Sequence, residues 1–448
     1  VVEDTGGAKE LKLRLHCYLS EPPSVAPDLS PMTEDPPDEA FELLASDIVK
    51  HCRGAANLVF ANSRADVELL ADACRVVGET MKLPDQFLVH HGSLSADIRR
   101  DAEETMKAGA VATTFCTPTL ELGVDIGSVR MVGQVDPPWS VASLKQRLGR
   151  SGRRPGEPEI LRMYIREEQV PPDGDLFDRL HLDLVRALAT TELLLSHWIE
   201  PPQPSVCDLS TLTHQIISTI GETGGCRAAD LFPRLCVQGP FRDVEPPLFT
   251  RLLRQLGARE VLEQMPEGDL ILGTLGERLY RHFTFYAIFQ TPETFTLIHG
   301  TERLGTLDIV PEPGQHVLFA ARRWLVIDVD PERKEIHVRP SRGRKRTHFG
   351  GRAGMLHPRI VGKMREVLLS SDVPTYLDDT SKLILDQSRR TAAEAALGLR
   401  NTLPLGPKRC CLLTWGGTRL HRTMAAMMMT LDVHPIDRLV GLELPMPE

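Results

Sequence analysis

The chain has 448 residues, with 52 Lys and Arg against 61 Asp and Glu, so its formal net charge is −9. This balance excludes a histone-like protein that holds nucleic acid by bulk positive charge, but it leaves room for a local basic groove. At about 100–200 residues per domain, the length predicts two to four domains. The sequence has no run of about 18 apolar residues and no signal peptide at its start, so we expect a cytoplasmic protein without a membrane span.

Cysteine usage and the first residue add two expectations. The nine cysteines include no C-x-x-C pair, which favours reduced, mostly buried thiols over a zinc ribbon or a dithiol redox site. Because the chain begins with Val1 rather than Met, we expect it to be a trimmed form or a part of something longer.

The first 167 residues predict a strand, a linker and an α/β domain. Residues 1–40 contain a strand-like alternation over Leu11–Ser20 and then a Pro-rich linker. From 41 to 167, the expected strands are Asn57–Ala61, Phe87–His90, Val111–Cys116, Met131–Asp136 and Ile160–Ile165. The expected helices are Ala40–Cys52, Arg64–Val77, Ser95–Lys107 and Ser140–Ser151. Short apolar strands alternating with helices are typical of a parallel sheet covered on both faces, with ligands beyond the carboxyl ends of its strands.

The rest of the chain predicts four further parts. Leucines at helical spacing over 175–198 predict a long connecting helix within 168–204. Residues 205–285 predict a winged helix, with three helices and a ribbon formed by Asp269–Leu272 and the segment around Gly276–His282. Short strands over 286–354 predict a small β-barrel-like domain with a basic loop, and 355–448 predict a mainly helical tail.

The strongest chemical signal is Gln146-Arg147-Leu148-Gly149-Arg150-Ser151-Gly152-Arg153-Arg154. Arg150 and Arg153 are three residues apart, so at a helix end they project to one side and can reach the same anion. Guanidinium groups stay charged and bond bidentately, which suits a phosphoryl group in transfer. A solvated basic helix end is the alternative interpretation.

Three strand-to-helix loops precede this motif in chain order. They are Phe60-Ala61-Asn62-Ser63-Arg64, His90-His91-Gly92-Ser93-Leu94-Ser95 and the segment from Cys116-Thr117-Pro118-Thr119 to Gly127. Each loop offers hydroxyl groups and free amide N–H groups at a helix start, which hold phosphate without reading base sequence.

Together these motifs resemble the second RecA-like lobe of superfamily-2 helicases. The exact sequences of these motifs, together with the predicted winged helix and barrel that follow them, are most similar to the large helicase-related (Lhr) group and its DEAD/DEAH-box relatives. The motifs cover about 41–167, whereas the resemblance beyond 175 rests on domain order and segments such as Ala321-Arg322-Arg323-Trp324.

The resemblance implies a role for each motif residue. Arg150 and Arg153 would face the γ-phosphate of ATP, with Arg153 as the arginine finger, and Gln146 would join the nucleotide and interlobe network. Gly123 and Asp125 would meet the nucleotide ribose. The tracking strand would contact Ser63, Arg64, Ser93, Thr117 and Thr119. Turn, capping and packing roles remain the alternatives for Gly123, Asn62, His90 and His91.

One departure from the helicase pattern is informative. The sequence contains no G-x-x-x-x-G-K-[ST] phosphate loop, and Asp38-Glu39 follows Pro36-Pro37, so it predicts a helix start rather than a magnesium site. We therefore expect half an ATPase site, inactive alone. ATP and Mg²⁺ would act only with a P-loop-bearing first lobe from a partner polypeptide or an N-terminal segment.

Two functional hypotheses follow. The first is the C-terminal part of an ATP-dependent helicase or translocase, on DNA rather than RNA, whose partners are single-stranded or unwinding nucleic acid and not a membrane. The alternative is an ATP-inert nucleic-acid-binding or scaffold subunit of a DNA repair or defence complex. Retention of Arg150, Arg153 and Gln146 favours the first, because a module without ATP has no chemical need for them.

A basic segment is the second candidate contact for nucleic acid. Residues 339–365 contain nine Lys and Arg and no acidic residue, so the remainder of the chain carries −18. Within it, Arg342, Arg344, Lys345 and Arg346 stand among turn formers and predict a phosphate-binding loop. A localisation signal or a solvated loop is the alternative. Trp324 is expected in the core, although Trp324 and Phe349 would also be able to stack on bases.

Overall fold

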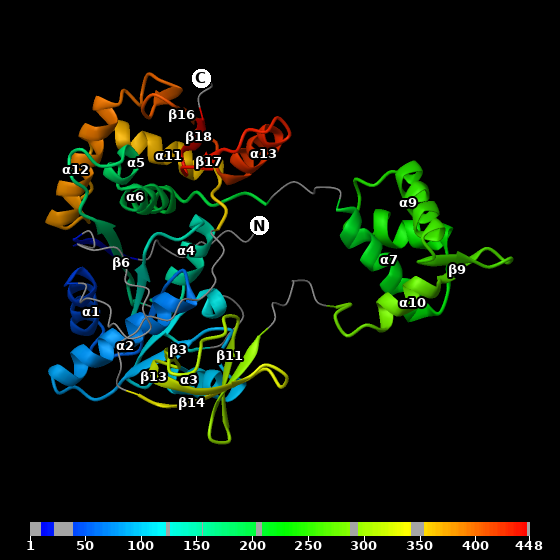
Figure 1. Cartoon of the computed structure of the whole chain (residues 1–448), viewed down its shortest axis with the longest axis horizontal. Coiled ribbons are helices and arrows are strands. Elements are labelled where there is room, and N and C mark those ends of the chain that lie inside the picture. The colour runs from blue at the N-terminus through cyan, green and yellow to red at the C-terminus, as the bar shows by residue number, and fades with distance from the viewer. Residues whose placement is uncertain are drawn as a thin grey trace. The chain divides into compact units, whose positions relative to one another are not determined.

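A computed structural model describes residues 10–21, 39–121, 126–154, 156–202, 208–286, 294–341 and 354–445. The chain divides into two compact units, residues 1–200 with 294–448 and residues 201–293. Each unit is described by itself (Figure 1).

The first unit is built on a six-stranded sheet with the order β1-β6-β5-β2-β4-β3. Every neighbouring pair is parallel. Its strands are β1 (Leu11–Ser20), β2 (Asn57–Phe60), β3 (Phe87–His90), β4 (Thr113–Cys116), β5 (Met131–Val135) and β6 (Glu159–Glu168). The α/β class and the parallel sheet are therefore confirmed. The predicted strand over Leu11–Ser20 pairs with β6 along its whole length, so it forms one edge of this sheet.

Helices cover both faces of the sheet, and each face has its own core. On one face, α1 (Glu39–His51) and α2 (Arg64–Thr80) pack on residues such as Val59 and Tyr164. The other face, with Phe60 and Met163, contacts helices of the lobe and of the C-terminal region. These are α3 (Ala96–Lys107), α4 (Val141–Leu148), α6 (Leu182–Leu195), α11 (Pro358–Leu369) and α12 (Asp379–Glu394).

A five-stranded sheet with the order β11-β10-β14-β13-β12 lies against α2 (Figure 1). Its strands are β10 (Phe295–His299), β11 (Glu302–Leu307), β12 (His316–Phe319), β13 (Arg322–Asp330) and β14 (Glu335–Pro340). The short strands predicted over 286–354 are present as these five, and closure into a barrel stays a prediction. Trp324 is buried and donates its indole N–H to the Phe319 carbonyl at 2.8 Å, as expected for a core residue.

Three residues spaced four apart on α2, Arg64, Glu68 and Asp72, dock this small sheet; we call them the α2 stripe. Glu68 is fully buried and accepts the N–H groups of Ala320 at 2.8 Å and Ala321 at 2.5 Å. The same carboxylate contacts His91 Nε2 at 2.8 Å. Farther along, Asp72 forms a bidentate ion pair with Arg323, with N–O distances of 2.6 to 3.1 Å. The small sheet is thus a fixed extension of the second lobe.

The turn that Glu68 binds has an unusual backbone. Ala320 and Ala321 connect β12 to β13 and have φ values of 55° and 52°, the pattern of a type I′ hairpin turn that favours Asn and Gly. A left-handed conformation costs alanine about 1–2 kcal/mol.

We therefore expect Ala320→Gly to raise the free energy of unfolding by about 1 kcal/mol. The same change at Ala426, an exposed position within a helix, should lower it by about 0.5–1 kcal/mol. Urea denaturation of the two variants checks this reversal of sign, and equal losses would contradict it.

The C-terminal region contains more strand than expected. Besides α11, α12 and α13 (Thr418–Met429), it has a four-stranded antiparallel sheet with the order β15-β16-β18-β17. Its strands are β15 (Thr402–Pro404), β16 (Arg409–Leu413), β17 (Ile436–Asp437) and β18 (Gly441–Pro445). They are too short to give a periodic signal in the sequence.

The second unit combines short helices with a three-stranded antiparallel sheet. Its elements are α7 (Leu209–Thr223), β7 (Cys226–Arg227), α8 (Ala228–Phe232), η2 (Pro233–Val237), α9 (Pro246–Ala258), β8 (Leu262–Gln264), β9 (Asp269–Leu272) and α10 (Thr274–Arg281). The predicted strand around Gly276–His282 is wrong, because Leu275 and Leu279 follow the four-residue spacing of a helix. The partner of β9 in the ribbon is β8.

The predicted connecting helix is also corrected. It consists of α5 (Leu176–Arg179) and α6, which are separated at His181 with φ of 46°.

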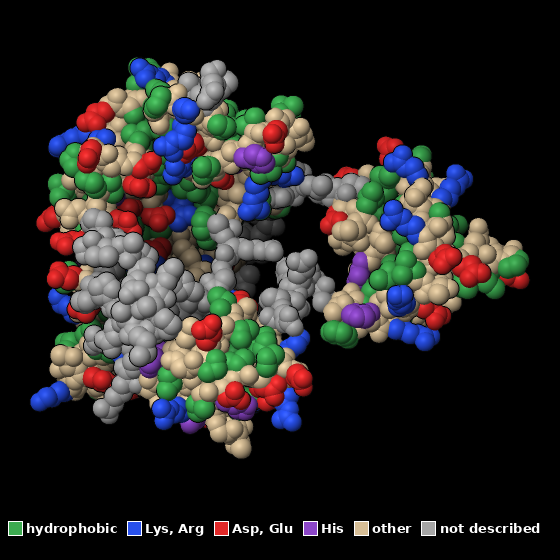
Figure 2. Space-filling view, in the orientation of Figure 1, with side chains coloured by type: hydrophobic (Ala, Val, Ile, Leu, Met, Phe, Trp, Pro, Cys, Tyr) green, Lys and Arg blue, Asp and Glu red, His purple; other side chains and the backbone are tan. Residues whose placement is uncertain are grey.

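The eight described cysteines are free and six of them are buried, as predicted. Among the described residues, no helix has both the length and the apolar character needed to cross a membrane. On the face shown in Figure 2, acidic and basic side chains are interspersed rather than gathered by sign.

Candidate functional site

The motif loops follow neighbouring strands of the large sheet and meet at the carboxyl edge of β2, β4 and β3. Serine starts the helices that leave two of these loops. Ser63 Oγ accepts the Asp66 N–H at 3.0 Å and caps α2, and Ser95 Oγ caps α3. Because Ser63 already serves as a helix cap, its free hydrogen-bonding capacity is limited.

Arg64 lies at the first position of α2 and contacts two other segments. One of its terminal nitrogens contacts Ser93 Oγ in the loop after β3. The other forms an ion pair with Asp308 Oδ2 at 2.6 Å, in the segment after β11. The structure therefore brings together Arg64 and Ser93, two of the predicted strand contacts, and adds a carboxylate that the sequence did not indicate.

Thr117 and Thr119 lie in the loop after β4 and contact the loop after β3. The Thr119 hydroxyl is 2.9 Å from His90 Nδ1, and the other ring nitrogen of His90 is 2.9 Å from Glu103 Oε1. The two threonine hydroxyls are 3.5 Å apart. Thr117 is buried and Thr119 is exposed, so Thr119 is the better placed of the two for an external strand.

Burial lowers the pKa of His90 below its usual 6.5, against the opposing effect of Glu103. The unfolded chain then binds the proton more readily, so His90 contributes stability at neutral pH that is lost as the pH falls below about 6.5. We expect the free energy of unfolding to fall between about pH 7 and pH 5, and to fall less in His90→Gln. Chemical denaturation at several pH values measures this. His434→Gln, at an exposed site, should keep the wild-type slope, and an unchanged slope in His90→Gln would refute the assignment.

Arg147 holds the arginine motif to the sheet, a role that the sequence reasoning missed. It is buried and donates to Glu121 Oε2 at 3.0 Å and to Gln134 Oε1 at 2.5 Å. Its guanidinium also lies 5.1 Å from the ring centroid of Phe60. The polar Gln134 within the otherwise apolar strand β5 was the available signal for a buried polar partner.

Arg150 and Arg153 follow the end of α4, in the turn beyond its last helical residue, Leu148. Arg150 is buried and donates to the Glu121 carbonyl at 2.6 Å, whereas the exposed Arg153 donates to the Gly127 carbonyl at 3.1 Å. Both side chains therefore reach the loop after β4. Gly152, between them, has φ of 62°, and a Cβ there would lie 2.9 Å from the Pro158 carbonyl oxygen.

The charge of Arg150 is destabilised in this turn. Burial is the main cause, and the positive charge of Arg153 adds to it, so the pKa of Arg150 is lowered from its usual value. A guanidinium whose charge is disfavoured in this way gains from a nearby anion. Gln146 is exposed on α4, while the predicted contacts Gly123, Asp125, Arg342, Arg344, Lys345 and Arg346 lie outside the described residues.

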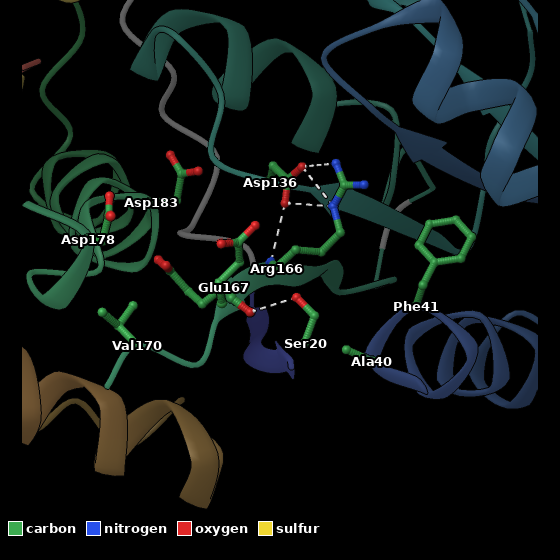
Figure 3. A pocket seen from close by; sticks show the side chains of 10 residues that line it. Ser20, Ala40, Phe41, Asp136, Arg166, Glu167, Val170, Asp178 and Asp183 are labelled. Carbon is green, nitrogen blue, oxygen red and sulfur yellow. Dashed lines mark hydrogen bonds and ion pairs between the residues drawn. The ribbon is translucent and has the colours of Figure 1, made fainter. Parts of the chain in front are cut away.

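A cavity of about 410 Å³ opens at the same sheet edge, beyond β1, β5 and β6 (Figure 3). Acidic side chains dominate its lining, but Asp136 pairs with Arg166 and Glu167 bonds to His181 at 3.2 Å. Burial pulls the pKa of Arg166 down, yet the carboxylates of Asp136 and Asp66 outweigh it and raise that pKa. The acidic lining of this cavity disfavours phosphates, and none of the predicted site residues lines it.

Comparison with known proteins shows similarity to helicases. Residues 39–155 match the family model described as the helicase conserved C-terminal domain. The ATP-dependent helicase Lhr-Core of Sulfolobus acidocaldarius is 31% identical over 180 residues, 40% of this chain and 19% of that protein. The Lhr helicase/uracil glycosylase of Escherichia coli is 24% identical over 379 residues, 75% of this chain and 23% of that protein. Residues 39–155 thus match a helicase C-terminal domain, and the chain is similar to Lhr-like superfamily-2 helicases.

A solved structure extends the similarity in fold beyond the second lobe. The structure of Mycobacterium smegmatis helicase Lhr bound to ssDNA and AMP-PNP covers 98% of this chain, with a TM-score of 0.67 and 19% identity. The match takes in 55% of that chain. The likeness in fold to that structure therefore extends to the C-terminal region and the second unit. The chain spans 19% and 23% of the two curated relatives described above.

Proposed function

We propose that this chain is the C-terminal part of an ATP-dependent nucleic-acid helicase or translocase, acting on DNA rather than RNA. The observation that carries the proposal is the pair Arg150 and Arg153, which both reach the loop after β4 at the carboxyl edge of the sheet. The single-stranded DNA named for the Mycobacterium smegmatis relative supports DNA as the substrate.

The arginine pair fits a nucleotide triphosphate. ATP with Mg²⁺ supplies a phosphoryl group whose transfer to water releases free energy, and a first RecA-like lobe would hold its remaining phosphates. Arg153 is exposed, and within the described part of the chain its guanidinium donates to the main-chain carbonyls of Gly149 and Gly127, so it can exchange them for a phosphate oxygen. Arg150 is already fixed by Glu121 and adds positive charge without needing to move.

The neighbouring residues position this pair. Arg147 ties the turn to Glu121 and Gln134, and Ser143 Oγ donates to the same Glu121 carboxylate at 2.5 Å. Glu121 thus links α4 to the loop after β4, where Thr117 and Thr119 lie. Closure of a first lobe on the nucleotide would move this loop and with it the strand contacts at Ser93 and Thr119.

The second unit is proposed to be a winged helix on the same strand. Its order of α7, β7, α8, α9 and the β8–β9 ribbon supports this. Arg251 and Arg254 lie on the exposed face of α9, where the helix would contact phosphates. The basic segment with Arg344, Lys345 and Arg346 is proposed as a further phosphate contact.

The isolated chain tests the missing-lobe hypothesis. We expect it to bind a single-stranded oligodeoxynucleotide and to show no ATP hydrolysis, because the sequence has no phosphate loop. Adding a polypeptide with a P-loop lobe should restore hydrolysis. Turnover by the isolated chain would contradict the half-site assignment, and binding without restored turnover would favour the ATP-inert module.

A further inference from the structure

The ion pair between Arg64 and Asp308 occupies a position where the proposed function needs an anion of another kind. Arg64 stands at the carboxyl edge of the sheet, beside the loop after β3, and its guanidinium contacts both Ser93 Oγ and Asp308 Oδ2. The side chains are only partly exposed, 28% for Arg64 and 14% for Asp308. A guanidinium that holds a hydroxyl with one nitrogen and a carboxylate with the other can hold a phosphate in place of the carboxylate.

Asp308 fills this site incompletely. Its Oδ2 accepts from Arg64 at 2.6 Å, but within the described part of the chain its Oδ1 is buried and has no hydrogen-bond donor. A buried carboxylate oxygen without a donor is a cost that most native structures avoid. The rest of the α2 stripe shows the contrast, since both carboxylate oxygens of Glu68 and of Asp72 have donors.

We propose that Asp308 is an internal competitor that stands in for a backbone phosphate of the bound strand and is displaced when that strand arrives. This proposal rests on the proposed function, because it takes the loop after β3 as a strand contact. A phosphodiester presents two acceptor oxygens to Arg64 and Ser93, so it satisfies the guanidinium and the hydroxyl together.

Displacement of the Asp308 carboxylate would affect the small sheet. Backbone bonds join β11 to the loop after β3: Ser95 N–H donates to Leu304 at 2.9 Å and Thr306 N–H donates to Ser93 at 2.8 Å. The approach is so close that a Cβ on Gly305 would lie 2.1 Å from the Ser93 carbonyl oxygen. Glu68 and Asp72 still hold the turn and β13, so release is confined to the end of β11 that carries Asp308. Binding of the strand would therefore change the structure of the small sheet at this end.

Charge-neutral replacement of Asp308 tests the competition. We expect Asp308→Asn in the full chain to bind a labelled single-stranded oligothymidylate up to about fivefold more tightly than the wild type, the scale of a partly exposed ion pair. The logarithm of affinity should also fall more steeply with the logarithm of salt concentration, by about 0.7, the slope of one additional phosphate contact. Asp328→Asn is the matched control, since it removes the same charge from an exposed position on β13 of the same sheet, and it should bind as the wild type does.

A double-mutant cycle assigns the effect to Arg64. Arg64→Ala should weaken binding, and Asp308→Asn should then produce no gain in the Arg64→Ala background. Equal affinities of Asp308→Asn and Asp328→Asn would overturn the competition while leaving the proposed function intact. Failure of the wild type itself to bind the oligothymidylate would overturn the proposed function, and this inference with it.

A measurement on the wild type guards against a variant that fails to fold. Saturation with the oligothymidylate should speed hydrogen exchange of the amides around Asp308, at the end of β11, while Ala320 and Ala321 stay protected. Slower exchange around Asp308 on binding would overturn the proposal, since it would mean that the ion pair is retained.

Discussion

Arg153→Ala, in a complex with a P-loop-bearing first lobe, is expected to lower ATP turnover by about 10³–10⁵-fold, the effect of removing an arginine finger. Arg153 is exposed, and within the described residues it bonds to the carbonyls of Gly149 and Gly127, so its loss should cost little folding stability. Affinity for single-stranded DNA should stay within about twofold of the wild type, because the hydrogen bonds of Arg153 among the described residues go to Gly149 and Gly127 rather than to a predicted strand contact.

The neighbouring Arg154 supplies the matched control. It lies one residue away in the same turn, is exposed, and pairs with Glu157 at 3.8 Å. Arg154→Ala removes the same side chain and charge without touching the loop after β4, so turnover should be nearly that of the wild type. Arg153→Lys should restore little, since an ammonium lacks the planar fork that bonds two oxygens. Equal turnover in Arg153→Ala and the wild type complex would favour the ATP-inert module instead.

The sequence predicted the large sheet well because its signals are local. Four-residue apolar runs such as Asn57–Phe60 and Phe87–His90 are buried, and serines mark the starts of α2, α3 and α4. Each of these features is decided by residues within one turn or one strand. The same locality explains the errors: the break at His181 comes from one left-handed residue, which no apolar spacing reveals.

The candidate site was predicted only in part, because its partners come from distant segments. Arg64 and Ser93 were expected near a strand, and the structure does bring them together. Asp308 comes from 244 residues beyond Arg64 in the chain, and no motif connects the two. Arg147, inside the recognised motif, was assigned no role, because only the fold shows that Gln134 and Glu121 lie on either side of its guanidinium.

The α2 stripe shows what could have been found and what could not. Arg64, Glu68 and Asp72 are spaced four residues apart, so their three charged side chains lie on one face of the helix. A helix of an α/β domain is otherwise expected to pack on the sheet through apolar residues. That pattern indicates a polar docking surface. It does not identify the partner, because Glu68 is held by backbone N–H groups, and any residue can supply those.

Glu68→Ala is expected to lower the free energy of unfolding of the first unit by about 3–5 kcal/mol, the scale of removing one partner from a buried charged network. The carboxylate is the acceptor for two main-chain N–H groups that are held in a left-handed turn, and it also contacts the fully buried His91. Without it, both N–H groups and the His91 ring nitrogen lose their partner together, and the strained turn loses the contact that fixes it. Glu68→Gln should recover only part of this, because an amide replaces one of the two acceptor oxygens by a donor facing an N–H group.

Urea denaturation with Glu79→Ala as the control measures the effect. Glu79 lies on the same helix but is exposed, so its removal should change stability by less than about 0.5 kcal/mol. Hydrogen exchange should place the loss in Glu68→Ala at Ala320, Ala321 and the neighbouring strands β12 and β13, with the β2 and β5 core still protected. A uniform loss across both sheets would mean that the small sheet and the second lobe unfold as one cooperative body, and that Glu68 stabilises the whole unit rather than its docked sheet. A loss below about 1 kcal/mol would contradict the role of Glu68 as the anchor of the small sheet.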